Sequence, residues 1–119
     1  MSEKKLFSTK DGVDAINAVM SPDFQISKLK SGDRFKAAHI IQTKKDDESC
    51  DDEETIVTTI ISPEGTSYQT LSNFVDRLIN TVNTMKPVEK WAESPVEFEV
   101  GWRDTNSGKK MLVLKLVNM

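Results

Sequence analysis

Apolar and polar residues alternate most regularly near the end of the chain, over residues 96–102. A two-residue period of this kind is typical of a strand that buries one face. Residues 111–117 alternate in the same way, and the Asp-Thr-Asn-Ser-Gly sequence at 104–108 is rich in turn-forming residues. The pattern therefore predicts two neighbouring strands joined by a hairpin loop.

A second predicted hairpin lies in the middle of the chain. Every residue from 55 to 61 is β-branched, and this composition favours a strand over a helix. Pro63-Glu64-Gly65 is expected to turn the chain, because proline presets φ and glycine tolerates a positive φ. Residues 67–70 can then return as a strand that carries Tyr68. Paired apolar residues in the first strand put hydrophobic groups on both faces, which favours a curled sheet or small barrel.

Residues 34–44 are predicted to form one long strand. Because successive side chains of a strand point to opposite faces, odd-numbered positions share one face and even-numbered positions share the other. The odd-numbered face carries Phe35, Ala37, His39 and Ile41. The even-numbered face carries Arg34, Lys36, Ala38, Ile40 and Gln42.

Two helices are predicted from apolar residues spaced three and four apart. The first spans residues 12–20 with Asp11 as its N-cap, and the second spans residues 73–85 with Ser72 as its N-cap. The apolar stripe of the first helix consists of Val13, Ile16, Val19 and Met20. The stripe of the second, which is expected to pack on the sheet, consists of Phe74, Val75, Leu78, Val82 and Met85.

The order of these elements indicates a fold class. After an N-terminal helix come three strands, a helix and two further strands. A helix between the third and fourth of five strands is the topology of the OB-fold, a partly open barrel that commonly binds oligonucleotides and oligosaccharides. We therefore expect a mainly β protein with two helices, built as one OB-fold-like, five-stranded barrel domain over residues 1–119, with residues 1–8 as a loose arm.

The charge is unevenly distributed. The net charge is −3, which by itself argues against a nucleic-acid partner, but residues 46–54 contain seven acidic residues and no basic one. The rest of the chain has 16 basic and 12 acidic residues, so it is mildly basic. Because the acidic segment has no apolar anchor and would repel phosphate, we expect it to form a loop outside any nucleic-acid groove.

Few residues are available for catalysis. His39 is the only histidine and Cys50 the only cysteine, so a Cys–His nucleophile pair or a multi-cysteine metal site lacks partners. The acidic segment lacks the Asp-x-Asp-x-Asp-Gly spacing of a calcium loop, and no Gly-rich phosphate loop occurs. The sequence therefore predicts a protein that is not an enzyme and has no cofactor and no metal. No apolar run has the length of a signal peptide or membrane span, which predicts a cytosolic protein that does not bind a membrane.

Binding of single strands needs only exposed aromatic faces and cations along a groove. Tyr68 is the first candidate for base stacking, whereas Phe24, Phe74 and Phe98 fit core positions. Trp91 and Trp102 are equally compatible with stacking and with closing one end of a barrel. The cations within reach of such a groove are Arg34, Lys36, Lys44, Lys45, Arg103, Lys109, Lys110 and Lys115.

The central hairpin also resembles a known family. Glu-Thr-Ile-Val-Thr-Thr-Ile at 54–60, followed by Glu-Gly-Thr-Ser-Tyr at 64–68, is similar to segments of the single-stranded-DNA-binding proteins of small tailed phages with protein-primed DNA replication. The resemblance implies an OB-like barrel, sequence-independent binding and no enzymatic activity. It also implies that Tyr68 takes the place of a DNA-stacking tyrosine. The tyrosines that the family carries between its first two strands are absent here.

Together these features predict a non-catalytic protein that binds single-stranded DNA and coats and protects replication intermediates in the cytoplasm of an infected bacterium. One alternative is a phage accessory module that binds a host or replication protein through a sheet edge or the acidic segment. Another is binding of RNA or oligosaccharide on the same fold. Salt dependence separates protein binding from nucleic-acid binding, because only phosphate contacts release counterions.

Overall fold

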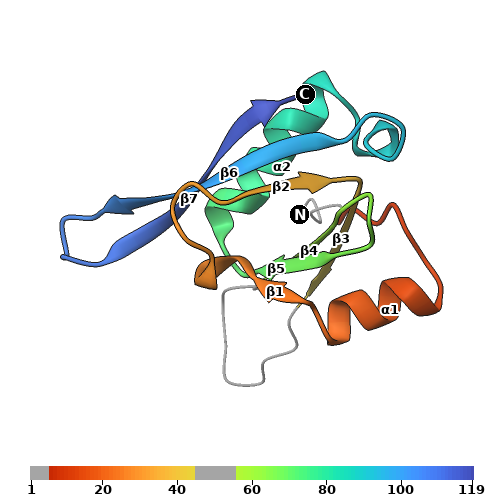
Figure 1. Ribbon diagram of the computed structural model, residues 1–119, viewed down its shortest axis with the longest axis horizontal. Coiled ribbons are helices and arrows are strands. Elements are labelled where there is room, and N and C mark those ends of the chain that lie inside the picture. The colour runs from red at the N-terminus through yellow and green to blue at the C-terminus, as the bar shows by residue number, and fades with distance from the viewer. Residues whose placement is uncertain (1–5, 45–55) are drawn as a thin grey trace, which may run out of the picture.

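A computed structural model describes residues 6–44 and 56–119 and contains two sheets and two α-helices (Figure 1). The first sheet has the strand order β1 (Phe24–Gln25), β5 (Ser67–Thr70), β4 (Ile56–Ile61) and β3 (His39–Lys44). The second sheet has the order β2 (Arg34–Ala37), β6 (Val96–Asp104) and β7 (Lys110–Asn118). The helices are α1 (Val13–Met20) and α2 (Asn73–Met85), and two short 3₁₀ helices are η1 (Ile26–Lys28) and η2 (Val88–Lys90). The prediction of a mainly β protein with two helices is confirmed.

The barrel prediction is wrong, because the strands do not close on themselves. β4 occupies one edge of β5, and β1 pairs in parallel with the other edge, with Phe24 opposite Tyr68 and Gln25 opposite Gln69. β5 therefore has no free edge for β7, and in the described chain the two sheets stay separate. The sequence predicted a core position and no strand for Phe24, so this pairing was not expected.

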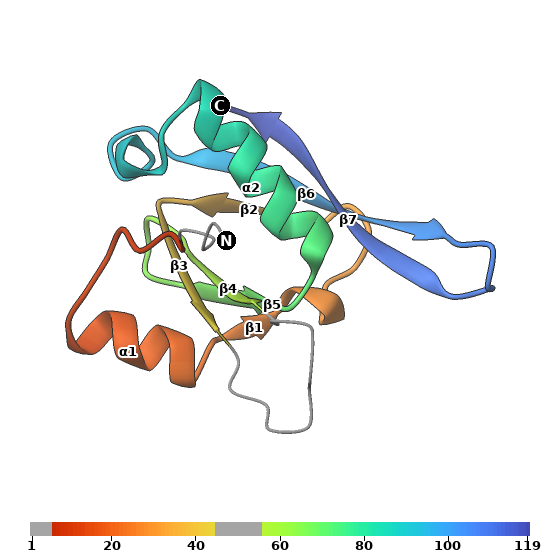
Figure 2. The same cartoon turned by 180° about the vertical axis from the view of Figure 1, so that it is seen from behind.

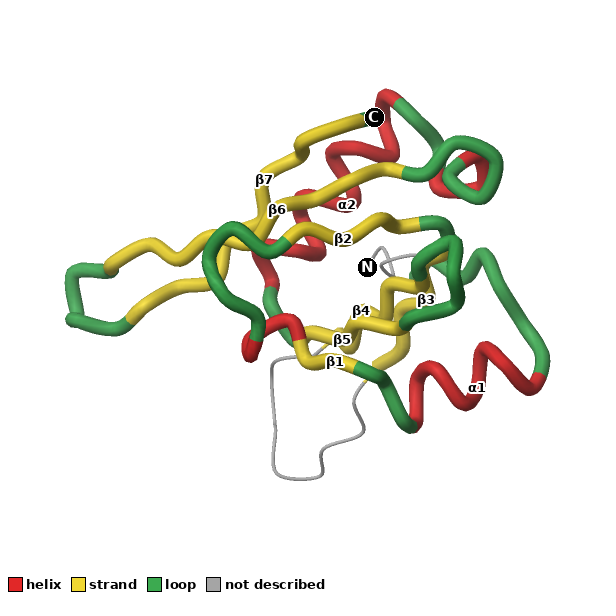
Figure 3. The backbone as a smooth tube through the Cα atoms, in the orientation of Figure 1, coloured by secondary structure: helices red, strands yellow, loops and turns green. Residues whose placement is uncertain are grey.

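The predicted long strand is divided at Ala38. Residues up to Ala37 pair with β6 in the second sheet, whereas residues from His39 onward pair with β4 in the first (Figure 3). Ala37 and Ala38 are both buried, and the backbone N–H of Ala38 donates to the carbonyl oxygen of Ile61 at 2.8 Å. Two small side chains in succession let the chain bend between the sheets. The inward face changes there from odd-numbered to even-numbered residues, so the single alternation predicted for this strand is wrong beyond Ala37.

The two helices differ in how well their sequence patterns predict packing. Helix α2 begins as predicted, with the Ser72 hydroxyl accepting from the Val75 N–H at 3.4 Å, and it packs on β7 and β4 (Figure 2). Val75 and Val82 of its stripe are buried, whereas Met85 is 77% exposed.

Helix α1 packs through Ala15, Ala18 and Val19 against Ile41 and Ile61. The rest of its predicted stripe is exposed, namely Val13, Ile16 and Met20. Its N-cap is Gly12 and no side chain caps it, so the prediction that Asp11 caps this helix is also wrong.

The described part of the N-terminal segment is not loose. Phe7 packs on the core, and its carbonyl oxygen accepts from the Gln42 N–H at 2.7 Å. Thr9 donates its N–H to the Ile40 carbonyl oxygen at 3.0 Å. The expected loose arm is therefore wrong for residues 6–8. The acidic segment 46–54, including Cys50, lies outside the described residues.

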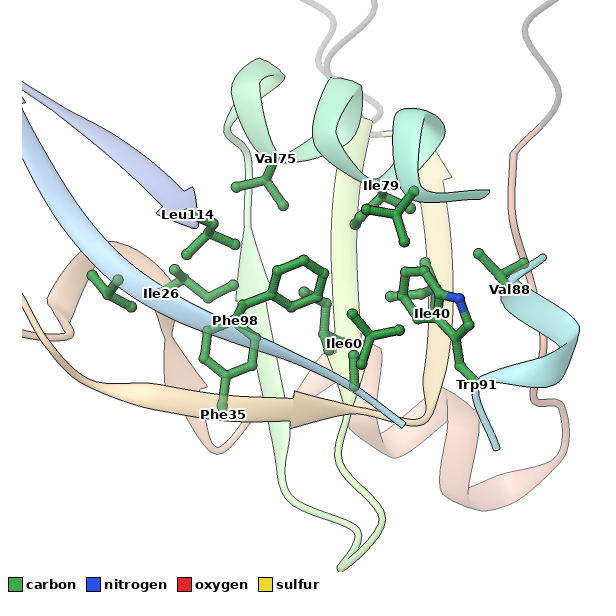
Figure 4. Close-up of a cluster of buried hydrophobic side chains, with 14 of the residues drawn as sticks. Ile26, Phe35, Ile40, Ile60, Val75, Ile79, Val88, Trp91, Phe98 and Leu114 are labelled. Atoms are coloured by element: carbon green, nitrogen blue, oxygen red, sulfur yellow. The ribbon is translucent and has the colours of Figure 1, made fainter. Parts of the chain in front are cut away.

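The main core fills the space between the sheets and beneath α2 (Figure 4). Phe98, Val96 and Val100 point inward from β6, as their alternation predicts, and Leu112 and Leu114 do so from β7. The β6–β7 hairpin continues beyond this core as a projecting arm (Figure 1).

Phe98→Ala is expected to lower the free energy of unfolding by about 3–5 kcal/mol, because Phe98 is fully buried and the truncation leaves a cavity. Met85→Ala, on the predicted stripe of α2 but exposed, is expected to change it by less than about 0.5 kcal/mol. Urea denaturation of the two variants measures both values. A large loss at Met85 would contradict the observed orientation of α2.

Candidate nucleic-acid interface

A cleft of about 380 Å³ lies where a pairing of β5 with β7 would have closed a barrel. One wall comes from β1 and the end of β5, and includes Gln25, Thr70 and Leu71. The other wall comes from the base of the β6–β7 hairpin and includes Trp102 and Lys110. Because the sheets stay apart at this position, the cleft is open to an extended ligand.

Trp102 stands in the wall of this cleft. It lies on the inward face of β6, opposite Leu112 of β7, and it is partly buried against the core. Its Nε1 donates to the carbonyl oxygen of Leu29 at 3.2 Å, which fixes the edge of the indole. The sequence left two roles open for Trp102, and the structure gives it a packed edge together with a position at the cleft.

Trp91 is not available to a base in this structure. Its side chain is fully buried, its Nε1 donates to the carbonyl oxygen of Lys86 at 2.9 Å, and its ring lies 6.2 Å from that of Phe98. Of the two roles predicted for Trp91, closing one end of the core is therefore the one that fits. A base-stacking role for Trp91 does not fit this burial.

Tyr68 is the second ring in a row of aromatic side chains that runs from the surface into the core. Its ring is nearly parallel to that of Phe24, at 5.4 Å, and to that of Phe35, at 4.6 Å. Phe35 in turn contacts Phe98 at 5.9 Å, and Phe98 contacts Trp91. We call these five residues the aromatic row. Two protein rings already stack on Tyr68, so much of the surface on which a base was predicted to stack is occupied.

Phe24 is the exposed end of the aromatic row, with 48% of its surface accessible. The sequence predicted it as a core residue, and that prediction is wrong. Phe24 lies at the surface end of the row because β1 pairs in parallel with β5, and this pairing puts Phe24 beside Tyr68. Two residues are too few to show a strand period, so sequence reasoning missed Phe24 as a candidate for binding.

The surroundings of Tyr68 favour its neutral form. Burial is the main cause that raises the pKa of the Tyr68 phenol, and the negative charges of Glu64 and Asp23 raise it further. His39, the single histidine, lies beside Thr9, with 3.5 Å between its Nδ1 and the Thr9 hydroxyl oxygen. Burial lowers the His39 pKa, as does the charge of Lys10, against a smaller raising effect of a hydrogen bond with Thr9.

The predicted cations divide into two groups. Arg34, Lys36 and Lys115 lie on the outward face of the second sheet, where Glu97 and Glu99 alternate with them across the strands. The Arg34 Nε is 3.1 Å from an Oε1 of Glu99, so this pair is already an ion pair. The acidic neighbours weaken the field that this face offers to phosphate.

The second group lies on the projecting hairpin and consists of Arg103, Lys109 and Lys110, all exposed. Lys110 shares the inward face of the hairpin with Trp102 and lines the cleft. Lys44 ends β3, but its side chain and all of Lys45 lie outside the described residues. The structure therefore brings one predicted aromatic residue and one predicted cation together in a single cleft.

The family model described as phage single-stranded DNA-binding protein, of the Phi29 type, matches residues 5–117. The chain belongs to this family. Its partner is therefore single-stranded DNA, as the sequence predicted. Comparison with curated proteins and with solved structures finds no match.

For a phage single-stranded DNA-binding protein, the useful surface is one that combines an aromatic face with a cation. In the described part of the chain the cleft combines Trp102 with Lys110, whereas the outward face of the second sheet offers cations without an aromatic ring. None of the described helices is both long and apolar enough to cross a membrane.

The pKa of Tyr68 gives a direct test of its environment, because it is the only tyrosine in the chain. Tyrosinate absorbance at 295 nm is expected to rise with a midpoint above pH 10 in the folded protein. Since the unfolded chain loses this proton first, the free energy of unfolding falls as the pH rises through about 10. Tyr68→Phe, measured by urea denaturation at pH 9 and pH 10.5, should show a smaller fall. A midpoint at or below pH 10 would contradict the partly buried position of Tyr68 beside two carboxylates.

Proposed function

We propose that this protein binds single-stranded DNA without sequence preference, as one non-catalytic domain over residues 1–119. In this role it coats and protects replication intermediates in the cytoplasm of the infected bacterial host. The observation that carries the proposal is the cleft between the sheets, where Trp102 and Lys110 line one wall. The family match supplies the ligand, and the cleft supplies a place for it.

The proposed mode of binding uses Trp102 as a stacking surface. Any base can cover an indole face, so this contact carries no sequence preference. The hydrogen bond from the Trp102 Nε1 to Leu29 and the packing of the ring on the core hold the side chain in place before DNA arrives. Little side-chain entropy is then lost on binding, which favours affinity.

The phosphates are proposed to follow the hairpin. Lys110 points to the same side as Trp102, and Lys109 precedes it at the tip of the projecting arm, whereas Arg103 lies on the other face of β6, opposite Met111. Asp104 is the single acidic residue between Val100 and the end of the chain. A strand with bases toward Trp102 therefore has its backbone next to Lys110, whose single acidic neighbour on the hairpin is Asp104, opposite it in the ladder.

We also propose that the strands and α2 form an OB-fold-like arrangement that is not closed. The order of β3, β4, β5, α2, β6 and β7, and the continuation of β2 into β3, support it. The missing pairing between β5 and β7 distinguishes this chain from a closed barrel. That opening is where we place the DNA.

Two single-tryptophan proteins test the site. Trp91→Phe leaves only Trp102, and its fluorescence is expected to fall on titration with oligo-dT because bases stack on the indole. Trp102→Phe leaves only the buried Trp91, and its fluorescence should hardly change. Trp102→Ala should weaken binding by about 5- to 150-fold, the loss of one stacked base. If the Trp91→Phe protein binds oligo-dT without a change in Trp102 fluorescence, Trp102 is not part of the binding site.

The salt dependence of binding tests the two groups of cations. Lys110→Ala is expected to make the slope of log K against log salt concentration shallower by about 0.7, the value for one phosphate contact on a single strand. Lys115→Ala is the matched control, since Lys115 lies opposite Glu99 on the outward face, and its slope should stay that of the parent. The opposite result would place the phosphates on the outward face of the second sheet.

A further inference from the structure

Phe24 combines exposure with a fixed position. Of the eight aromatic side chains, Phe24 is exposed and the other seven are buried or partly buried, although exposing an apolar ring to water is unfavourable. Exposed apolar side chains such as Met20 and Met85 are long and flexible, whereas the Phe24 ring is rigid and flat. Such a ring at the surface calls for a reason beyond packing.

The backbone beside Phe24 is held on both sides. Before it, the Asp23 carboxylate accepts from the Ser67 N–H at 2.9 Å, and the Asp23 N–H donates to the Ser67 hydroxyl at 2.9 Å. After it, Ile26 is fully buried and starts η1. Phe24 itself pairs with Tyr68 across the β1–β5 ladder. The position of the ring is therefore set by the fold.

The ring also has a fixed orientation. It is nearly parallel to Tyr68, with 18° between the ring planes, and Tyr68 is supported in turn by Phe35 in the core. One surface of Phe24 thus rests on the aromatic row while much of the remainder faces solvent. This is the arrangement of a stacking platform that needs no rearrangement to receive a flat ligand.

The charges around Phe24 are mixed, because two lysines follow it while the carboxylates of Asp23 and Glu64 act on the Tyr68 ring beneath it. Residues 24–32 contain Lys28 and Lys30, both exposed, and no acidic residue. Gln25, the next residue, lines the same cleft as Trp102 and Lys110. Asp23 carries a negative charge on the other side, so the contribution expected of Phe24 is stacking and not phosphate binding.

We propose that Phe24 is a second base-stacking platform, on β1 one residue before the cleft-lining Gln25, and that Tyr68 supports this platform from beneath. The ligand is an unpaired base of a single-stranded nucleic acid. The inference rests on the proposed DNA-binding function and adds a residue that the sequence assigned to the core. It also changes the role of Tyr68, which supports Phe24 and does not itself stack on a base. Removing the Tyr68 ring then weakens binding because Phe24 loses its support.

Affinity for oligo-dT is the first measurement. Phe24→Ala is expected to weaken binding about fivefold or more, with the salt slope of the parent, because a base contact is lost and phosphate contacts are kept. Phe24→Tyr should bind within about twofold of the parent. Phe24→Leu keeps an apolar cover over Tyr68 but has no flat ring, and it should bind like Phe24→Ala. A leucine variant that binds like the parent overturns the proposal.

A reporter at the position itself is the second measurement. In a protein with Trp91→Phe and Trp102→Phe, Phe24→Trp supplies the only indole, and oligo-dT should quench it. Met85→Trp in the same background is the control, because Met85 is exposed and ends α2, whose N-cap Ser72 is the part of the helix that lines the cleft. Quenching at Met85 and not at position 24 also overturns the proposal. If the parent does not bind oligo-dT at all, the proposed function itself fails, and this outcome is distinct from the other two.

Discussion

The parallel pairing of β1 with β5 is the constraint on which the functional surface depends. Only two residues of β1 take part, so the pairing needs the additional hydrogen bonds between Asp23 and Ser67 and the burial of Ile26 next to it. By occupying the edge of β5, β1 keeps β7 away and leaves the sheets open. The same pairing places Phe24 beside Tyr68. One short ladder therefore determines both the cleft and the exposed end of the aromatic row.

The aromatic row then links two sheets that share no ladder within residues 6–44 and 56–119 and that the chain joins directly at Ala38. Tyr68 belongs to the first sheet and Phe35 to the second, and their ring centroids lie 4.6 Å apart. Within the second sheet, Phe35 continues the row to Phe98, with 5.9 Å between the ring centroids. Aromatic pairs of this kind add about 0.5–1.5 kcal/mol beyond the burial of their area. A base that stacked at the surface would thus rest on a support that reaches the core, and the wall of the cleft would move little on binding.

Charge distribution restricts where the DNA backbone can lie. Glutamates alternate with cations on the outward face of the second sheet, and the Arg34–Glu99 pair shows that they interact directly. The hairpin carries three cations around one aspartate. An exposed ion pair adds little to stability, about 0–1 kcal/mol, so the glutamates matter more for reducing the positive potential of that face. Of the predicted cations with described side chains, those on the hairpin are the better placed.

The sequence by itself determined the elements whose signals are local. The β-branched segment with its Pro-Glu-Gly turn, the strict alternation of β6 and β7, and α2 with its Ser72 cap all formed where predicted, because strand period, turn chemistry and capping act within a few residues. The family resemblance was carried by one of these segments, and the family match confirms it.

The tertiary structure decided everything that depends on contacts between distant segments. Nothing in residues 34–44 marks Ala38 as the point where the strand changes sheets. Two successive alanines permit a bend, but the chain bends there because the residues before Ala38 pair in one sheet and those after it pair in the other. The different fates of Trp91 and Trp102 follow from which part of the fold each side chain meets, and the sequence left the same two roles open for both. The sequence predicts Phe24 as a core residue. In the structure it pairs with a strand more than 40 positions later in the chain, and about half of its surface is exposed to solvent. Periodicity reports which side of an element is apolar, but only the assembled sheets fix which apolar groups stay at the surface.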